Sequence, residues 1–211
     1  MKRIALIPVA LSAFALVAQD ASKQPAPAQA PAPAQAPAPA PAPAMSPEQE
    51  AAMKAMQPGP MHAALARFAG SYTTSTTFIA KPGDAPQTST GTATLKMTLD
   101  GRFLTEDGSG NTMGMPFTSF RLMGYDNAVK RFEGIWTWTL STCVLKVDGH
   151  SSDGGKNIWW TASYHDGLGK LQTFKALMHT VDADHFTEKI EGKNPDGTPG
   201  PVMETTYTRA K

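Results

Sequence analysis

The chain has 211 residues, of which 19 are lysine or arginine and 18 are aspartate or glutamate, so its formal net charge at pH 7 is +1. Binding to nucleic acid depends mostly on neutralising phosphates, so a balanced charge without a basic run excludes nucleic acid as the expected partner. A single cysteine, Cys143, excludes an internal disulfide, so the fold must be stabilised by packing.

The first 18 residues have the pattern of a secretory signal peptide. A basic start, Met1 to Arg3, precedes the uncharged apolar run Ile4–Ala18. This run is too short, and too interrupted by Pro8, to span a membrane. We therefore expect cleavage after residue 18, with Ala21 as the alternative site. No membrane span should remain, and the location should be the bacterial periplasm or the exterior.

Residues 19–60 are expected to form a disordered linker that contains one short helix. Proline and alanine alternate from Gln24 to Ala44. Because proline fixes φ and lacks an N–H, this repeat favours an extended spacer without a core. A helix is expected near residues 46–56, because Ser46 suits the N-cap and Pro47 the first helical position.

Residues 61–211 are sufficient for one domain with a sizeable core. Leu65 and Phe68 are spaced for a short helix, and the chain after them alternates with the period of strands. Ten strands are expected, near Ser71–Ile79, Thr90–Leu99, Arg102–Gly108, Phe117–Tyr125, Arg131–Leu140, Cys143–Gly149, Ile158–His165, Leu171–Thr180, His185–Gly192 and Val202–Arg209.

The turns between these segments predict consecutive hairpins. Asp100-Gly101, Asp166-Gly167 and Asp196-Gly197 all offer residues that tolerate positive φ. No helix of crossover length separates the strands, so the sheet should be antiparallel. We expect an all-β fold: an up-and-down antiparallel barrel of about ten strands, preceded by a short helix, whose closure removes exposed edges.

Large aromatic side chains share single faces of these strands. Phe132, Trp136 and Trp138 alternate on one face, and Trp160 and Tyr164 do the same further along. In a barrel of this size the inward face either fills itself with side chains or leaves room for one small ligand. If there is a cavity, its candidate lining is Phe132, Trp136, Trp138, Trp160, Tyr164 and Met97.

Three segments carry a resemblance to a known family. They are "LDGRFLTEDGSG" (99–110), "GYDNAVKRFEGIWT" (124–137) and "VDGHSSDGGKNI" (147–158). The chain resembles the bacterial domain of unknown function 1579, whose members are similar to lipocalin-like barrels. The resemblance implies a barrel for most of residues 61–211, and it implies no reaction, substrate or catalytic residue.

The start of the first strand is similar to that of lipocalins. Lipocalins have Gly-x-Trp there, with an arginine from a late strand over the indole, and this chain has Gly70-Ser71-Tyr72. We expect Arg209 to stack on the Tyr72 ring and close the barrel by a cation–π contact.

Motifs that carry chemistry are missing from the sequence. There is no Gly-x-Ser-x-Gly, no phosphate-binding loop and no His-Glu-x-x-His, so no catalytic residue, metal ligand or cofactor is expected. Glu106, Asp107 and Glu133 are a conceivable carboxylate pair across neighbouring strands. Cys143 is expected to be a small buried hydrophobe inside a strand.

Three functional hypotheses follow. The first is an exported binding module whose interior takes a small hydrophobic molecule. The second is a filled structural barrel that contacts another component of the cell envelope. The third is an enzyme, or a haem-binding barrel, that uses a histidine facing the interior.

Overall fold

The computed structural model describes residues 45–112, 114–194 and 196–211. The predicted signal peptide and the Pro-Ala repeat lie outside the described residues. Within those ranges, no helix is both long and apolar enough to cross a membrane.

In the part of the chain that the structure describes, two short helices precede ten strands. They are α1 (Pro47–Ala55), α2 (Pro60–Ala66), β1 (Gly70–Ile79), β2 (Gln87–Thr98), β3 (Phe103–Thr112), β4 (Met115–Asp126), β5 (Arg131–Trp138), β6 (Leu145–His150), β7 (Asn157–His165), β8 (Leu171–Thr180), β9 (His185–Lys193) and β10 (Pro199–Arg209). Ser46 caps α1 with a reciprocal capping box.

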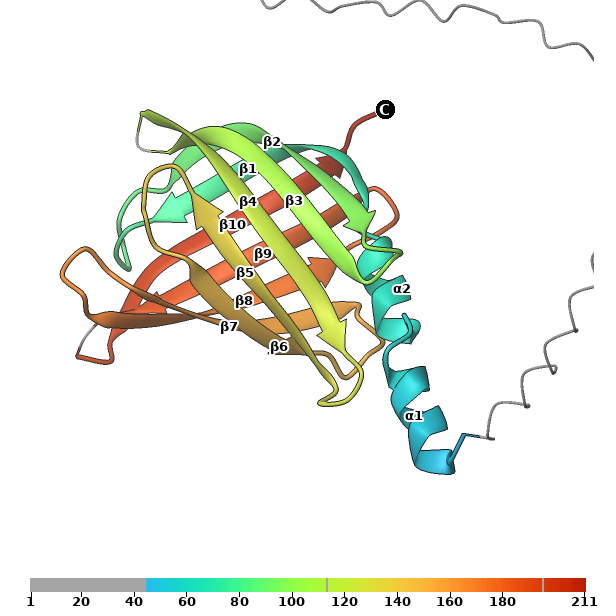
Figure 1. Ribbon diagram of the computed structural model, residues 1–211. Helices are drawn as coiled ribbons and strands as arrows, with labels where there is room; N and C mark the ends of the chain where they lie inside the picture. Colours follow the sequence, from blue (N-terminus) through green and yellow to red (C-terminus); the bar gives the residue numbers. More distant parts are fainter. Residues whose placement is uncertain (1–44, 113, 195) are drawn as a thin grey trace, which may run out of the picture. The chain divides into compact units, whose positions relative to one another are not determined.

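The strands form one closed barrel in which each strand pairs with its neighbours in sequence (Figure 1). All pairs are antiparallel, and β1 closes the barrel against β10 from Tyr72↔Arg209 to Ile79↔Val202. The predicted up-and-down barrel is therefore confirmed. Several boundaries differ by a few residues; for example, β3 ends at Thr112 and not at Gly108. Strand β6 begins at Leu145, so Cys143 lies in the preceding loop, half-buried, where the Ser141 hydroxyl donates to its Sγ at 3.1 Å.

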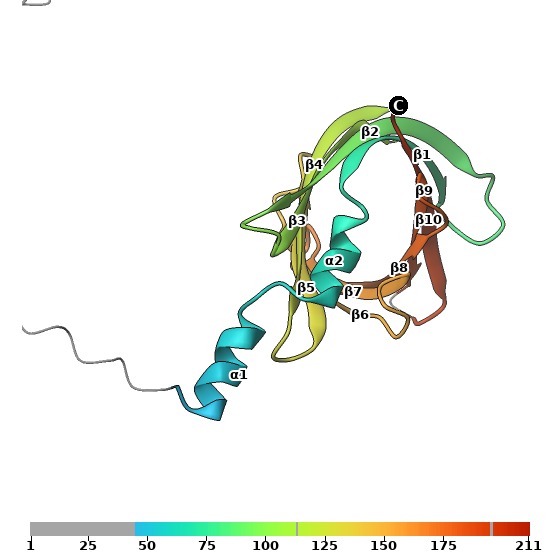
Figure 2. The same ribbon diagram turned by 90° about the vertical axis from the view of Figure 1, so that its right-hand side faces the viewer.

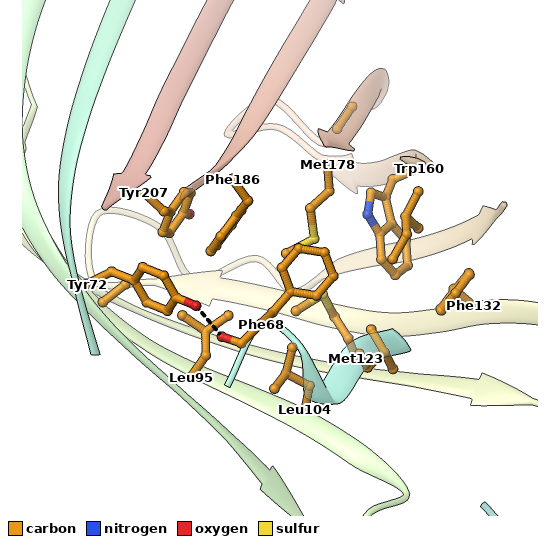
Figure 3. Packing of buried hydrophobic residues seen from close by; sticks show 14 residues of the cluster. Phe68, Tyr72, Leu95, Leu104, Met123, Phe132, Trp160, Met178, Phe186 and Tyr207 are labelled. Atoms are coloured by element: carbon orange, nitrogen blue, oxygen red, sulfur yellow. Dashed lines mark hydrogen bonds between the residues drawn. The ribbon is translucent and has the colours of Figure 1, made fainter. Parts of the chain in front are cut away.

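Helix α2 lies within one end of the barrel (Figure 2). Its start is held by the backbone N–H of Gly59, which donates to Nδ1 of His62 at 3.0 Å. Leu65 on α2 and Phe68 just after it are fully buried against side chains from the strands, as Figure 3 shows for Phe68. This end of the barrel is therefore filled by a hydrophobic core.

The expected contact between Arg209 and Tyr72 is present at the same end. The guanidinium carbon of Arg209 lies 4.9 Å from the centroid of the Tyr72 ring, which confirms the predicted cation–π pair. Arg209 also donates to the carbonyl of Ala69 at 2.7 Å and to that of Arg67 at 3.1 Å. A Cβ on Gly70 would collide with this guanidinium, which explains the glycine of the Gly-x-Tyr motif.

The turn between β4 and β5 ties the barrel to the segment that precedes α2. The carboxylate of Asp126 accepts hydrogen bonds from the backbone N–H groups of Ala128 at 2.7 Å and Val129 at 3.2 Å. Lys130 in this turn takes a left-handed conformation, with φ of 57°. The Asn127 amide donates to the carbonyls of Ala55 at 3.0 Å and Gln57 at 2.7 Å.

We expect Asp126→Ala to lower the free energy of unfolding by about 1 kcal/mol, because two local hydrogen bonds are lost while the strands remain paired. Urea denaturation measures this change. Asp166→Ala is the internal comparison, since Asp166 also accepts two backbone bonds in a hairpin loop. A loss of several kcal/mol at Asp126 would contradict a purely local role for its carboxylate.

Candidate functional site: a cavity with a charged floor

A cavity of about 590 Å³ occupies the barrel away from α2. Neighbouring strands run in opposite directions, so its lining comes from the ends of odd-numbered strands and the starts of even-numbered ones, as with Phe78 on β1 and Phe174 on β8. No residue of α2 contributes to the lining. The cavity opens among the loops at this end, where Lys193 and Asn194 are exposed.

One wall of the cavity is aromatic. Trp136 and Trp138 on β5 lie with their ring centroids 5.3 Å apart. Tyr164 on β7 and Phe174 on β8 meet edge to face at 6.3 Å. All four rings line the cavity, so an apolar molecule would find a continuous aromatic surface here.

Apart from Phe78 near the end of β1 and Glu106 at the floor, the wall formed by β1, β2 and β3 consists mostly of small side chains. Thr74 on β1 pairs with Gly91 on β2, which pairs with Gly110 on β3. These residues are too small to reach the aromatic wall, so the space between the walls stays empty. The cavity therefore depends on small residues on one side as much as on large residues on the other.

The six residues predicted to line a cavity divide between the two ends of the barrel. Trp136, Trp138 and Tyr164 line the cavity. Phe132 and Trp160 instead belong to the core around α2, and Met97 packs against that core. The reason is position along the strand: Phe132 precedes Trp136 by four residues on β5, which is about 13 Å of strand.

Four polar side chains form the floor of the cavity, where it meets the core. We call Glu106, Arg121, Glu188 and Tyr207 the polar cluster. Arg121 forms a bidentate pair with Glu188, each N–O distance being 2.7 Å. Its Nε lies 3.7 Å from Oε2 of Glu106, and the Tyr207 hydroxyl donates to Oε1 of Glu106 at 3.3 Å.

The polar cluster is buried but lines the cavity. Arginine side chains remain protonated in proteins, so Arg121 is a cation. Its guanidinium carbon also lies 4.6 Å from the centroid of the Trp136 ring. Burial raises the pKa of Glu106; Arg121 opposes this shift and Glu188 adds to it. Burial and then the charge of Glu106 raise the pKa of Tyr207 well above its ordinary value, so its hydroxyl stays protonated and can donate.

The conceivable carboxylate pair among Glu106, Asp107 and Glu133 is not the arrangement found. Asp107 is exposed, and Glu133 pairs with Arg131 on the outside of the barrel. Glu106 is connected instead to Glu188, through Arg121, because β3, β4 and β9 bring these inward positions together. Arg121, Glu188 and Tyr207 were not among the residues predicted from the sequence to line the cavity.

A signal for the polar cluster was nonetheless present. Glu106 alternates with Leu104, and Arg121 alternates with Met123, so both charges share a face with residues of the core. In the same way Glu188 alternates with Phe186 on β9. A charge on the apolar face of a strand is costly unless it is paired, so three such charges predict a buried group.

The five histidines take no part in the cavity. None of them belongs to its described lining. Among the described residues, no group of three or more histidine, cysteine, aspartate or glutamate side chains is placed to hold a metal ion.

The raised pKa of Glu106 predicts a pH effect on stability. A carboxyl group whose pKa is raised on folding contributes stability that is present below its unfolded pKa and is lost as the pH rises through the folded pKa. The contribution of Glu106 should therefore decline as the pH rises above 4.5, the ordinary pKa of a glutamate side chain. Glu106→Gln should remove this decline, so the variant gains stability relative to the wild type as the pH rises.

Denaturation midpoints measured from pH 4 to pH 8 on both proteins give the difference curve that isolates this group. Asp107→Asn removes the neighbouring exposed carboxylate from the outside of the same strand, and it controls for the change in net charge. A flat difference between Glu106→Gln and the wild type would show that Glu106 is not the titrating group.

The comparison with one solved structure agrees with the barrel. The crystal structure of Rv2717c from M. tuberculosis is similar, with a TM-score of 0.54 and 13% identity, over 74% of this chain and 100% of that chain. A redesigned β-barrel is more distant, with a TM-score of 0.37 and 13% identity over 70% of this chain and 96% of that chain. The S-type phycobiliprotein lyase CPES from Guillardia theta has a TM-score of 0.48 and 9% identity over 70% of this chain and 90% of that chain. At these identities the likeness concerns the fold alone.

No curated protein matches the chain. Residues 57–209 match the family described as "Protein of unknown function (DUF1579)". This match covers most of the chain, including α2 and its N-cap Gly59. The protein therefore belongs to the DUF1579 family, as the three resembling segments predict.

Proposed function

We propose that the barrel binds one small, largely apolar molecule in its cavity. The observation that carries this proposal is the unfilled space of about 590 Å³ next to the aromatic wall. Ligand sites typically have about 300–1,000 Å³ and are lined by apolar and aromatic groups with a few convergent polar ones. The polar cluster at the floor supplies the convergent polar groups.

The core at the other end supports a binding role. Helix α2 and the side chains around it stabilise the barrel, so the cavity end does not need to be filled for the fold to persist. A barrel with a purely structural role has no need for the small residues of β1 to β3 opposite the aromatic wall. A packed core at one end and an unfilled cavity at the other therefore favour a binding role.

Tryptophan fluorescence of the full chain, titrated with decanol, tests the proposal. Decanol should change the emission of Trp136 and Trp138, because both rings line the cavity. The matched control is Trp159→Phe, since Trp159 is 47% exposed on the outside of β7 and its loss should leave the titration unchanged. An emission spectrum that does not respond to decanol, or to aromatic alcohols of similar size, would refute the proposal.

We infer that the mature protein acts outside the cytoplasm, on the basis of the basic start and apolar run of residues 1–18. The Pro-Ala repeat would then separate the barrel from the new N-terminus. Expression of the full chain in a bacterium, followed by fractionation and N-terminal sequencing, should yield a protein in the periplasm or medium that begins at Gln19. An uncleaved chain in the cytoplasm would contradict this inference.

A further inference from the structure

The floor of the cavity holds two carboxyl groups and one cation. Glu106 and Glu188 are both buried there, with Arg121 as the single cation. When both carboxylates are ionised, the sum is one negative charge. Within the described lining the only other charged residue is Lys193, which is exposed at the opening and touches none of the polar cluster.

Arg121 is already paired with Glu188 within the protein. Its two terminal nitrogens donate to both oxygens of Glu188, and its guanidinium lies over the Trp136 ring. Its Nε has no hydrogen-bond partner, but it lies 3.7 Å from Oε2 of Glu106. A bidentate arginine–carboxylate pair is a strong interaction that a ligand would have to break. Arg121 is therefore a poor anchor for a ligand carboxylate, which would also be repelled by Glu106.

Glu106 is the carboxylate of the polar cluster that has an unused hydrogen-bond acceptor. Its side chain is buried, with a residue exposure of 5%, and Oε2 has no hydrogen-bond partner. Oε1 has only the long contact with Tyr207, at 3.3 Å. A buried carboxylate oxygen without a donor costs free energy, and a ligand that brings a donor would remove that cost.

On the basis of the proposed function, we propose that the cavity selects apolar amines, whose ammonium group donates to Glu106 at the floor while the apolar body lies along the aromatic wall. The ammonium supplies both the missing donor and the missing positive charge. Trp136 contacts Arg121 at the floor and also lines the aromatic wall. The ammonium group and the apolar body of such a ligand would therefore bind next to each other. An ammonium close to aromatic faces is stabilised further.

The selection should depend on pH in a defined direction. The groups that face Glu106 are Arg121 on β4, Glu188 on β9 and Tyr207 on β10, with Asp107 next to it on β3, and burial raises its pKa. Alkylamines stay protonated near neutral pH, as lysine does. Amine binding should therefore weaken as the pH falls through the raised pKa of Glu106, because the protonated carboxyl has lost its charge.

Isothermal titration calorimetry of the full chain with decylamine, decanol and decanoic acid tests this inference at pH 7. The three probes share one apolar body and differ in the charge of the head group. Decylamine should bind at least about tenfold more tightly than decanol, which corresponds to one charged hydrogen bond. Decanoic acid should bind most weakly.

Glu106→Gln should lower the affinity for decylamine about tenfold or more and so remove most of its preference over decanol. Asp107→Asn removes the same charge from the next residue, outside the barrel, and should leave both affinities unchanged. Equal binding of decylamine and decanol by the wild type, or preferred binding of decanoic acid, would overturn the inference and leave the proposed function standing. Failure of all three probes to bind would refute both. The ranking of probes on the wild type decides the matter even if the variant does not fold.

Discussion

Replacing Arg121 with methionine should lower the free energy of unfolding at pH 7 by about 3–5 kcal/mol, the cost of removing one partner from a buried ionic group. Glu188 would lose two hydrogen bonds of 2.7 Å, and Glu106 would lose its nearest cation. Two buried carboxylates would then face each other without compensation. Because protonation neutralises them, the loss should shrink as the pH is lowered.

Two further variants make this experiment specific. Arg131→Met removes an arginine that pairs with Glu133 on the exposed face of β5, and it should leave stability nearly unchanged. Adding Glu106→Gln and Glu188→Gln to the Arg121→Met protein should recover most of the loss, because no buried charge remains. If the triple variant is as unstable as the single one, the cost lies in packing and not in charge.

Phe132→Ala should have an effect of similar size, about 3–5 kcal/mol, for a different reason. Phe132 is 0% exposed and contacts Tyr125 and Trp160 with ring centroids 4.9 Å and 5.6 Å apart. Its removal leaves a void in the core around α2 that the surrounding rings cannot fill without moving. Urea denaturation of the full chain measures the loss.

Trp138→Ala, on the same strand and the same inward face, is the matched comparison. Trp138 is half-buried and lines the cavity, so its truncation enlarges a space that is already open. Stability should change little, while the fluorescence response to decanol should weaken. A loss of stability equal to that of Phe132→Ala would show that this end of the barrel is packed as densely as the other.

The strands could be predicted because their signals are local. Alternation of apolar and polar residues locates each strand, and pairs such as Asp166-Gly167 locate the turns, so the order of an up-and-down barrel follows without long-range information. Even the pair of Tyr72 and Arg209, far apart in sequence, could be expected from the similarity to lipocalins. It forms because the first and last strands meet when the barrel closes.

The cavity and its floor could not be predicted in the same way. Alternation of apolar and polar residues indicates which side chains face inward. It does not indicate how far along the barrel axis α2 fills the interior, and this depth decides that Phe132 lies in the core and Trp136 in the cavity. Arg121 and Glu188 are 67 residues apart. Their pairing depends on the shear of the closed sheet, because the shear determines which inward-facing positions of different strands meet across the interior.

The measurement that tests the central claim most directly is a crystal structure of the full chain grown with decanol. The account predicts electron density for one molecule inside the barrel, in contact with the rings of Trp136 and Trp138, with the core around α2 unchanged. A barrel in which side chains from the opposite walls meet and fill this space, leaving decanol bound only outside or not at all, would contradict it.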